Sequence, residues 1–525
     1  MKKNQAIIVG LLSGAVFLLA FLLSYRLFFR LDLTRNKAYT ISEVSRNLYR
    51  DISDEVKITY FVSDKLRQAH PMPGEIADLL REYAAHSRGR IRFVQKDPAK
   101  AELVREVEGL GIMPQQIQLA EKNEITVTTV YTGILIEYLD KEMVIPIVFS
   151  LDTLEYDLSS RIRSLVRNVE REVGVIVGDS HLQWGSEFGL LDRELTFSGF
   201  RIRQVNPNEP VPANLPALFV FGGVEDLGEE ELAHIDAYIL GGGNVFFALN
   251  GVFVDTRSGF EARALQDNGL LAMLANYGVI VRQALVLDRT ALNITFQSQT
   301  RTGTVIQTMR YPEWIAVQQL GGNPDHPVTA RFGGLDLYWA SPLELIPPED
   351  VTGEVLLSST NQAWLQTENF VTNPTLNTQF EDEARDTLGT KILAASLSGF
   401  FPSGIPSLGN SSGGLESRPA QMLRKPSRII VVGNSFFAGG LMQVNRGEER
   451  NLSFLIRAAD WLSNDDDIVA IRGREESAGR LDRLTDDRMR DRVMTFSRSL
   501  NTIVIPLGVI LAGLFLVWKR RVKPK

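Results

Sequence analysis

The chain has 525 residues, a formal net charge of -7 at pH 7 and no cysteine. This length accommodates roughly two to four domains, and a hydrophobic content of 44% is typical of a globular protein with a large core. The missing cysteines exclude disulfides, thiolate metal sites and cysteine nucleophiles. Because basic residues are not in excess, no nucleic acid is expected as a partner.

Two apolar stretches lie near the ends of the chain, at residues 6–24 and 500–518. Each is close to the roughly 20 residues that a helix needs to cross a bilayer. A short basic tail follows the second stretch, which predicts a cytoplasmic C-terminus. The first stretch lacks a small-x-small cleavage site after it, so an uncleaved anchor is favoured over a cleaved signal peptide.

These stretches predict a two-pass protein of the cell (inner) membrane with both termini in the cytoplasm. Residues 1–29 would be an N-terminal transmembrane signal anchor, and residues 500–525 a C-terminal transmembrane helix with its basic tail. Everything between them would be extracytoplasmic, which means periplasmic in a bacterium with two membranes. Residues 476–499 carry apolar side chains at near-helical spacing and predict a juxtamembrane stalk helix.

Residues 30–170 have the pattern of a small α/β domain. Helices are expected where apolar residues recur at helical spacing, and strands where they alternate. The expected helices are 43–51, 74–86 and 99–110. The expected strands are 55–62, 90–95, 125–130, 133–138 and 143–147.

Residues 171–475 predict a larger α/β domain. Short apolar strands alternate there with amphipathic helices, which is typical of a parallel, doubly wound sheet. A segment at about 290–425, rich in Thr, Gln and Asn in its first part, is expected as an insertion. The expected helices are 188–198, 229–240, 269–277 and 451–462. The expected strands are 174–178, 200–205, 215–222, 244–249, 279–287 and 428–433.

Several segments in this order resemble one protein family. They read LDLTRNKAYTIS from Leu31, LLREYAAHSRGRIRFVQKDP from Leu79, LEYDLSSRIRSLVR from Leu154, KILAASLSGFFPS from Lys391 and SRIIVVGNSFF from Ser427. The chain resembles the GldG-like (gliding-motility) auxiliary components of ABC-2 type transporters. This resemblance implies a fold similar to glutamine-amidotransferase domains, and it implies an ABC-2 type permease and a separate cytoplasmic ATPase as partners. It carries over no catalytic residue.

The sequence offers little for catalysis or cofactor binding. An amidotransferase-like domain needs a cysteine nucleophile on its strand-to-helix elbow, and this chain has none. Ser435 follows an expected strand but does not form a G-x-S-x-G elbow. The motif G-x-x-x-x-G-K-[ST] is missing as well, so ATP binding by a P-loop is excluded. No cofactor, no metal and no enzymatic activity are therefore expected.

One candidate pocket remains, at the end of the first strand of the larger domain. Asp179, Ser180 and His181 follow that strand, and Gly222 ends a neighbouring one. Ligands of open α/β sheets bind at the carboxyl ends of the strands, so these residues could line a pocket. In the alternative interpretation, Asp179 and Ser180 cap backbone N–H groups of their own loop.

The leading hypothesis is a non-catalytic membrane-anchored auxiliary subunit of an ABC-2 type transporter. Two alternatives stay open: an extracytoplasmic hydrolase, or a ligand-binding module acting at the cell envelope. A deep, partly apolar pocket at the sheet edge would favour ligand binding, whereas exposed apolar surface elsewhere would favour a protein partner.

Overall fold

The structure is a computed structural model. It describes residues 43–48, 50, 52–100, 103–121, 124–149, 151, 154–167, 171–180, 182–256, 259–300, 303–330, 332–374, 387–405, 424–444 and 447–463. The chain divides into two compact units, Met1–Glu476 and Ser477–Lys525, and all described residues belong to the first. Both predicted membrane spans and the predicted stalk lie outside the described residues. Among the described helices, none has the length and apolar character needed to cross a membrane.

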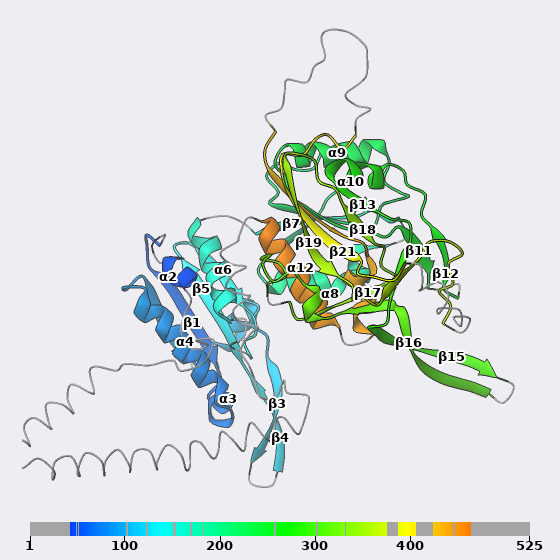
Figure 1. The fold of residues 1–525 in the computed structure, drawn as a ribbon. Helices are drawn as coiled ribbons and strands as arrows, with labels where there is room; N and C mark the ends of the chain where they lie inside the picture. Colours follow the sequence, from blue (N-terminus) through cyan, green and yellow to red (C-terminus); the bar gives the residue numbers. More distant parts are fainter. Residues whose placement is uncertain are drawn as a thin grey trace, which may run out of the picture. The chain divides into compact units, whose positions relative to one another are not determined.

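A four-stranded sheet organises the N-terminal part of the described chain (Figure 1). Strand β1 (Val56–Val62) pairs in parallel with β2 (Ile91–Lys96) and antiparallel with β5 (Thr132–Tyr138). Strand β6 (Lys141–Ile145) extends the sheet beyond β5. Helix α4 (Met72–His86) makes the crossover between the parallel strands, since a parallel pair cannot be joined by a tight turn.

Helix α6 (Leu154–Arg167) completes this part, and its apolar residues join those of α4 and the sheet in one core. The expected helix at 99–110 is shorter in the structure. Strand β3, whose sequence QQIQLAE contains only two large apolar residues, was not expected, and it forms a hairpin with the expected β4. The remaining elements are α2 (Glu43–Leu48), α3 (Asp64–Ala69), α5 (Val104–Gly109), β3 (Gln115–Glu121) and β4 (Glu124–Val130).

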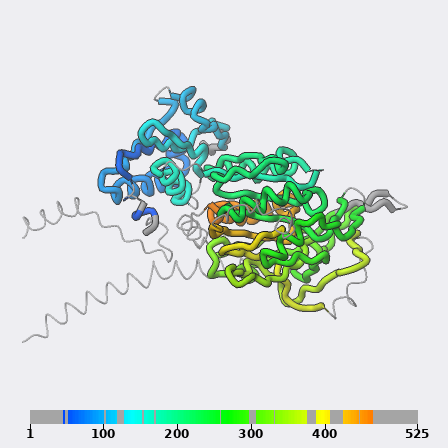
Figure 2. Tube along the Cα trace, turned by 90° about the horizontal axis from the view of Figure 1, so that it is seen from above, coloured from blue at the N-terminus to red at the C-terminus, as the bar shows by residue number. Residues whose placement is uncertain are grey.

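A nine-stranded sheet forms the larger part, in the order β13-β18-β21-β22-β10-β9-β7-β8 with β19 paired to β21. Five neighbouring strands are parallel, as the alternation of strands and helices predicted. They are β7 (Glu172–Val177), β8 (Arg201–Gln204), β9 (Ala217–Phe221), β10 (Val245–Ala248) and β22 (Ser427–Val432). Strand β22 comes late in the chain but lies in the middle of the sheet, between β21 and β10, and Figure 2 shows the orange part of the chain among green and yellow neighbours.

The expectation of a purely parallel sheet is wrong at the other end, where the sheet is antiparallel. Strands β18, β19 and β21 come from the segment expected as an insertion, and they extend the main sheet. The single strand expected at 279–287 is two strands, β13 in this sheet and β14 outside it. The bounds are β13 (Val279–Val281), β14 (Leu285–Asp288), β18 (Leu343–Leu345), β19 (Val351–Ser358) and β21 (Ile392–Gly399).

Helices cover both faces of the nine-stranded sheet. Along β9 the side chains alternate between two cores: Phe219 and Phe221 belong to one, and Leu218 and Val220 to the other. This alternation follows from the period of two in a strand, and it explains why β9 is apolar throughout. The first core includes residues of α8 (Gly189–Phe197) and α12 (Glu448–Leu462), and the second those of α9 (Glu229–Leu240) and α10 (Leu270–Tyr277).

Smaller sheets and short helices pack beside the first core. Strands β15 and β16 form a long hairpin, and only the last residues of β16 pair with β17 (Figure 1). The elements are α7 (Trp184–Glu187), β11 (Val252–Asp255), β12 (Glu261–Ala264), β15 (Ala291–Thr300), β16 (Gly303–Val317), η1 (Gln319–Gly321), β17 (Leu335–Tyr338), β20 (Ala363–Gln366), η3 (Phe436–Ala438) and η4 (Gly440–Gln443).

Candidate functional site

The structure brings two of the candidate pocket residues together at the carboxyl ends of β7 and β9. Asp179 accepts a hydrogen bond from the backbone N–H of Gly223 at 2.7 Å. A Cβ at Gly222, where φ is +69°, would overlap the Asp179 carboxylate. The two loops are therefore in direct contact, and Asp179 fastens one to the other.

Ser180 also takes part in holding this edge, through its backbone rather than its hydroxyl group. Its N–H donates to the carboxylate of Asp226 at 2.6 Å. Asp179 thus accepts a backbone N–H, as in the alternative interpretation, but from the neighbouring loop, whereas Ser180 contributes only its own N–H as a donor. His181, the remaining candidate, lies outside the described residues.

The ends of β10 and β22 lie further along the same edge. Polar residues that follow these strands form hydrogen bonds with backbone groups. Asn250 accepts from the N–H of Ser435 at 2.7 Å. Asn434 accepts from the N–H of Phe437 at 3.0 Å, and the hydroxyl of Ser341 accepts from the N–H of Gly251 at 2.8 Å. Asn434 and Ser341 are fully buried, and Ser435 is only 6% exposed. These residues hold the strand ends in place rather than facing a substrate cleft.

An aromatic cluster next to this edge adds to its closure. Trp339 is fully buried with a φ of +55°, a conformation that non-glycine residues seldom adopt. Its ring contacts those of Phe436 at 5.5 Å and Trp314 at 5.6 Å between centroids. Its indole N–H donates to the hydroxyl of Tyr311 at 2.9 Å. Burial, together with the nearby Glu313 carboxylate, raises the pKa of Tyr311 far above its usual value, so this hydroxyl stays protonated.

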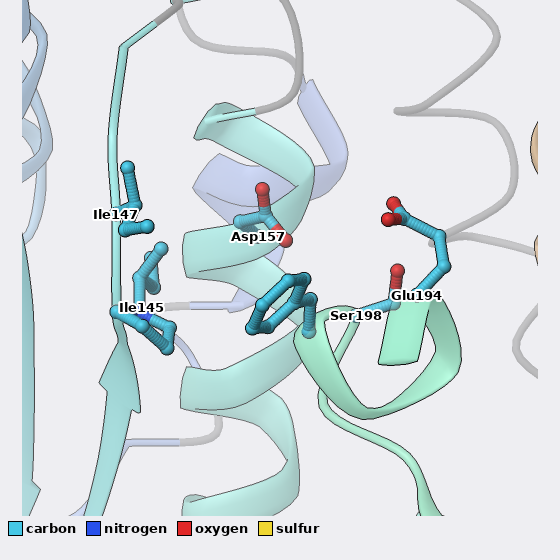
Figure 3. A pocket seen from close by; sticks show the side chains of 7 residues that line it. Ile145, Ile147, Asp157, Glu194 and Ser198 are labelled. Atoms are coloured by element: carbon cyan, nitrogen blue, oxygen red, sulfur yellow. The ribbon is translucent and has the colours of Figure 1, made fainter. Parts of the chain in front are cut away.

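A cavity of about 200 Å³ lies away from this edge, beside α6 and α8 (Figure 3). Asp157 on α6 lies between Ile145 and Ile147, at the end of β6, and Glu194 on α8. Sequence reasoning did not identify these residues, because they come from three separated segments. The cavity is lined by Ile145, Pro146, Ile147, Asp157, Glu194, Phe197 and Ser198.

A buried arginine fixes the wall of this cavity. Arg161 is 2% exposed, and it donates to the carboxylate of Asp157 at 2.9 Å and to the carbonyl oxygen of Val144 at 3.3 Å. It also donates to the carbonyl oxygen of Phe197, at the end of α8. The i,i+4 spacing of Asp157 and Arg161 is the one signal of this arrangement that the sequence contains. One guanidinium thus positions the three segments around the cavity.

These observations define a mixed α/β protein whose larger sheet is closed at the carboxyl ends of β10 and β22. The family described as an ABC-type uncharacterized transport system matches residues 170–466, more than half of the chain. The chain belongs to this family of ABC transporter auxiliary components, which indicates an accessory, transporter-associated role. A domain of unknown function (DUF7088) matches residues 35–137.

A relative and three solved structures add context. An uncharacterized protein of Borreliella burgdorferi strain B31 is 25% identical over 535 residues, which is 99% of each chain. The N-terminal domain of mmIFT52 is 13% identical, with a TM-score of 0.32. The match covers 55% of this chain and 96% of the mmIFT52 domain. A ThuA-like protein from Parabacteroides merdae is 12% identical, with a TM-score of 0.28. The match covers 56% of this chain and 89% of the ThuA-like chain.

The third solved structure is the exo-beta-1,4-mannosidase Op5Man5 from Opitutaceae bacterium strain TAV5. It is 11% identical, with a TM-score of 0.24, and covers 74% of this chain and 49% of its own. At TM-scores this low, none of these structures defines the fold or the activity of the chain.

Proposed function

We propose that the chain is a non-catalytic, membrane-anchored auxiliary subunit of an ABC-2 type transporter, acting with a separate permease and a cytoplasmic ATPase. The family supports the transporter role. The closed sheet edge supports the non-catalytic role, and this is the observation that carries the proposal. Open α/β sheets bind ligands at the carboxyl ends of their strands. Here Asn250, Ser341 and Asn434 occupy those ends with hydrogen bonds to the protein itself.

The proposed arrangement in the membrane rests on the two apolar stretches of the sequence. Residues 6–24 and 500–518 would anchor the chain and dock on the permease, with the α/β domains outside the cytoplasm. Movement of the permease, driven by ATP, would reach these domains through residues 476–499. A GldG-like role in gliding motility is a narrower form of the same proposal, and it rests on the sequence resemblance alone.

The experiment that tests the proposal is purification of the tagged full-length chain from its native membrane in a mild detergent, followed by quantitative mass spectrometry. An ABC permease and an ATPase in near-stoichiometric amounts would support the proposal. An unrelated two-pass membrane protein, tagged in the same way, is the control for adventitious capture. If the chain is recovered alone under conditions in which another ABC complex of the same membrane stays intact, the proposed role is refuted.

A further inference from the structure

The cavity beside α6 and α8 has the volume of one side chain. Pockets for drug-sized ligands and cofactors measure roughly 300–1,000 Å³, and a cavity of roughly 150 Å³ holds a benzene ring. At about 200 Å³ the present cavity is too small for a nucleotide or a sugar chain. It accommodates a short alkyl group with a compact head.

One part of the cavity lining is apolar. Ile145, Pro146 and Ile147 form one wall, and the ring of Phe197 contributes to the lining from α8. Phe197 is 43% exposed although it is a large aromatic residue. A methylene chain covering it would remove apolar surface from water, and the face of the ring attracts a cation. These residues favour an occupant with an aliphatic stem.

The charged residues in the described part of the lining are acidic. Asp157 and Glu194 contribute carboxylates, and among the residues that the structure describes no basic side chain lines the cavity. In Figure 3 the two carboxylates come from facing helices, α6 and α8. A carboxylate accepts several hydrogen bonds at once, so the bond that Asp157 accepts from Arg161 leaves room for another donor. These acceptors favour an occupant that carries N–H groups and a positive charge.

Arg161 does not compete for this position. It is buried, and it donates hydrogen bonds to the Asp157 carboxylate and to the carbonyl oxygens of Val144 and Phe197. It acts as a positioning residue, because it holds Asp157 and the end of α8 at the cavity while its own charge is matched by Asp157.

From this geometry we infer that the cavity binds an alkylguanidinium or alkylammonium group, with the stem against Ile145, Ile147 and Phe197 and the cationic head between Asp157 and Glu194. The group is either the Arg or Lys side chain of a partner protein or a free small amine. The inference does not depend on the transporter role, since it follows from the lining of the cavity alone.

The test uses the full-length chain in detergent with 13C-labelled isoleucine methyl groups, because two isoleucines line the cavity. The probes are n-butylguanidinium and its neutral isostere n-butylurea. We expect the Ile145 and Ile147 methyl resonances to shift with butylguanidinium at about millimolar concentration. Butylurea should bind at least about tenfold more weakly, because it offers no charge-assisted hydrogen bond. Equal shifts with both probes, or no shift with either, would overturn the inference.

A pair of variants ties binding to the cavity. Glu194→Gln keeps the shape of the side chain and should weaken butylguanidinium binding about fivefold, since one charge-assisted contact is lost. Glu230→Gln is the matched control, because Glu230 is exposed on α9, away from the cavity lining. Melting temperatures of both variants establish that they are folded. If Glu194→Gln binds as the unchanged chain does, the assignment of the cationic head is wrong.

A third measurement separates the two sources of the cation. The photo-crosslinker p-benzoylphenylalanine is placed at position 197 in native membranes. An adduct on a polypeptide close to an Arg or Lys, suppressed by butylguanidinium, identifies a partner protein. No adduct, together with a positive titration, identifies a free amine. An adduct that butylguanidinium does not suppress contradicts the inference.

Discussion

The buried ion pair between Arg171 and Asp460 makes the sharpest prediction about stability. Arg171 lies directly before β7, and Asp460 lies on α12 with no exposure to solvent. The hydroxyl of Tyr156 on α6 donates to the same carboxylate at 2.7 and 2.8 Å. The guanidinium carbon of Arg171 is 3.9 Å from the centre of the Phe200 ring. One carboxylate therefore links α6, β7 and α12.

Asp460→Asn keeps the shape of this side chain but removes the negative charge that the buried guanidinium of Arg171 faces. Breaking a buried pair in this way costs about 3–5 kcal/mol in the free energy of unfolding. For a domain of this size, 1 kcal/mol lowers the melting temperature by roughly 2–4 °C. We therefore expect a decrease of about 6–20 °C for this variant.

The assay is thermal unfolding of the full-length chain in detergent, followed by tryptophan fluorescence. The double variant Arg171→Met with Asp460→Asn should be more stable than the sum of the single losses predicts, because the second change removes the unpaired charge. Glu344→Gln, which breaks the exposed pair with Arg282, is the control and should leave the melting temperature unchanged within error. Additive losses in the double variant, or a negligible loss in Asp460→Asn, would refute the reasoning.

Three further predictions concern buried groups of the larger domain. Burial raises the pKa of Asp336 above its usual 3.8, so Asp336 loses its proton at a lower pH in the unfolded chain than in the folded one. The free energy of unfolding therefore falls as the pH rises from 3.8 through the folded pKa. Asp336→Asn should flatten this dependence in melting curves between pH 4 and 7. Gly433→Ala should lower the free energy of unfolding in urea by at least about 1–3 kcal/mol, because its Cβ would overlap the carbonyl oxygen of Ser341. The control Gly185→Ala should be nearly neutral, because a Cβ there meets nothing within 4 Å. Tyr277→Phe should cost about 1.5–3 kcal/mol in the same assay, because the Tyr277 hydroxyl donates to the buried carboxylate of Asp236 at 2.5 Å.

Local signals predicted the parallel strands and their helices well. Helix α9 (Glu229–Leu240) has the bounds that its sequence predicted, because glycines stand immediately on both sides of its apolar pattern. Gly242 after it has a φ of +98°, which a C-terminal glycine supplies at low cost. Strand β9 was found equally well, since a strand buried on both faces is an uninterrupted apolar run.

Long-range pairing set the limit of the prediction. The local sequences of β18 and β19 do not reveal that β18 pairs with β13 and β19 with β21. Antiparallel pairing of this kind depends on how distant segments pack. The sequence placed Asp179 and Gly222 at the carboxyl edge as candidate pocket residues, but it did not predict their direct contact or how the neighbouring part of that edge is closed. Ser341 reaches it from a distant segment of the chain.

The closed edge and the cavity differ in how their polar groups are engaged. At the strand ends, the side-chain oxygens of Asn250 and Asn434 accept backbone N–H groups, so a ligand that used these oxygens would have to break buried hydrogen bonds. On α6 the situation is different, since two adjacent residues have separate tasks. Tyr156 anchors the helix to the buried Asp460, whereas Asp157 lines the cavity. A cation bound beside Asp157 would thus contact α6, a helix that is hydrogen-bonded to α12 through Tyr156 and Asp460. Any shift of α6 on binding would therefore be transmitted to the larger domain through these buried hydrogen bonds.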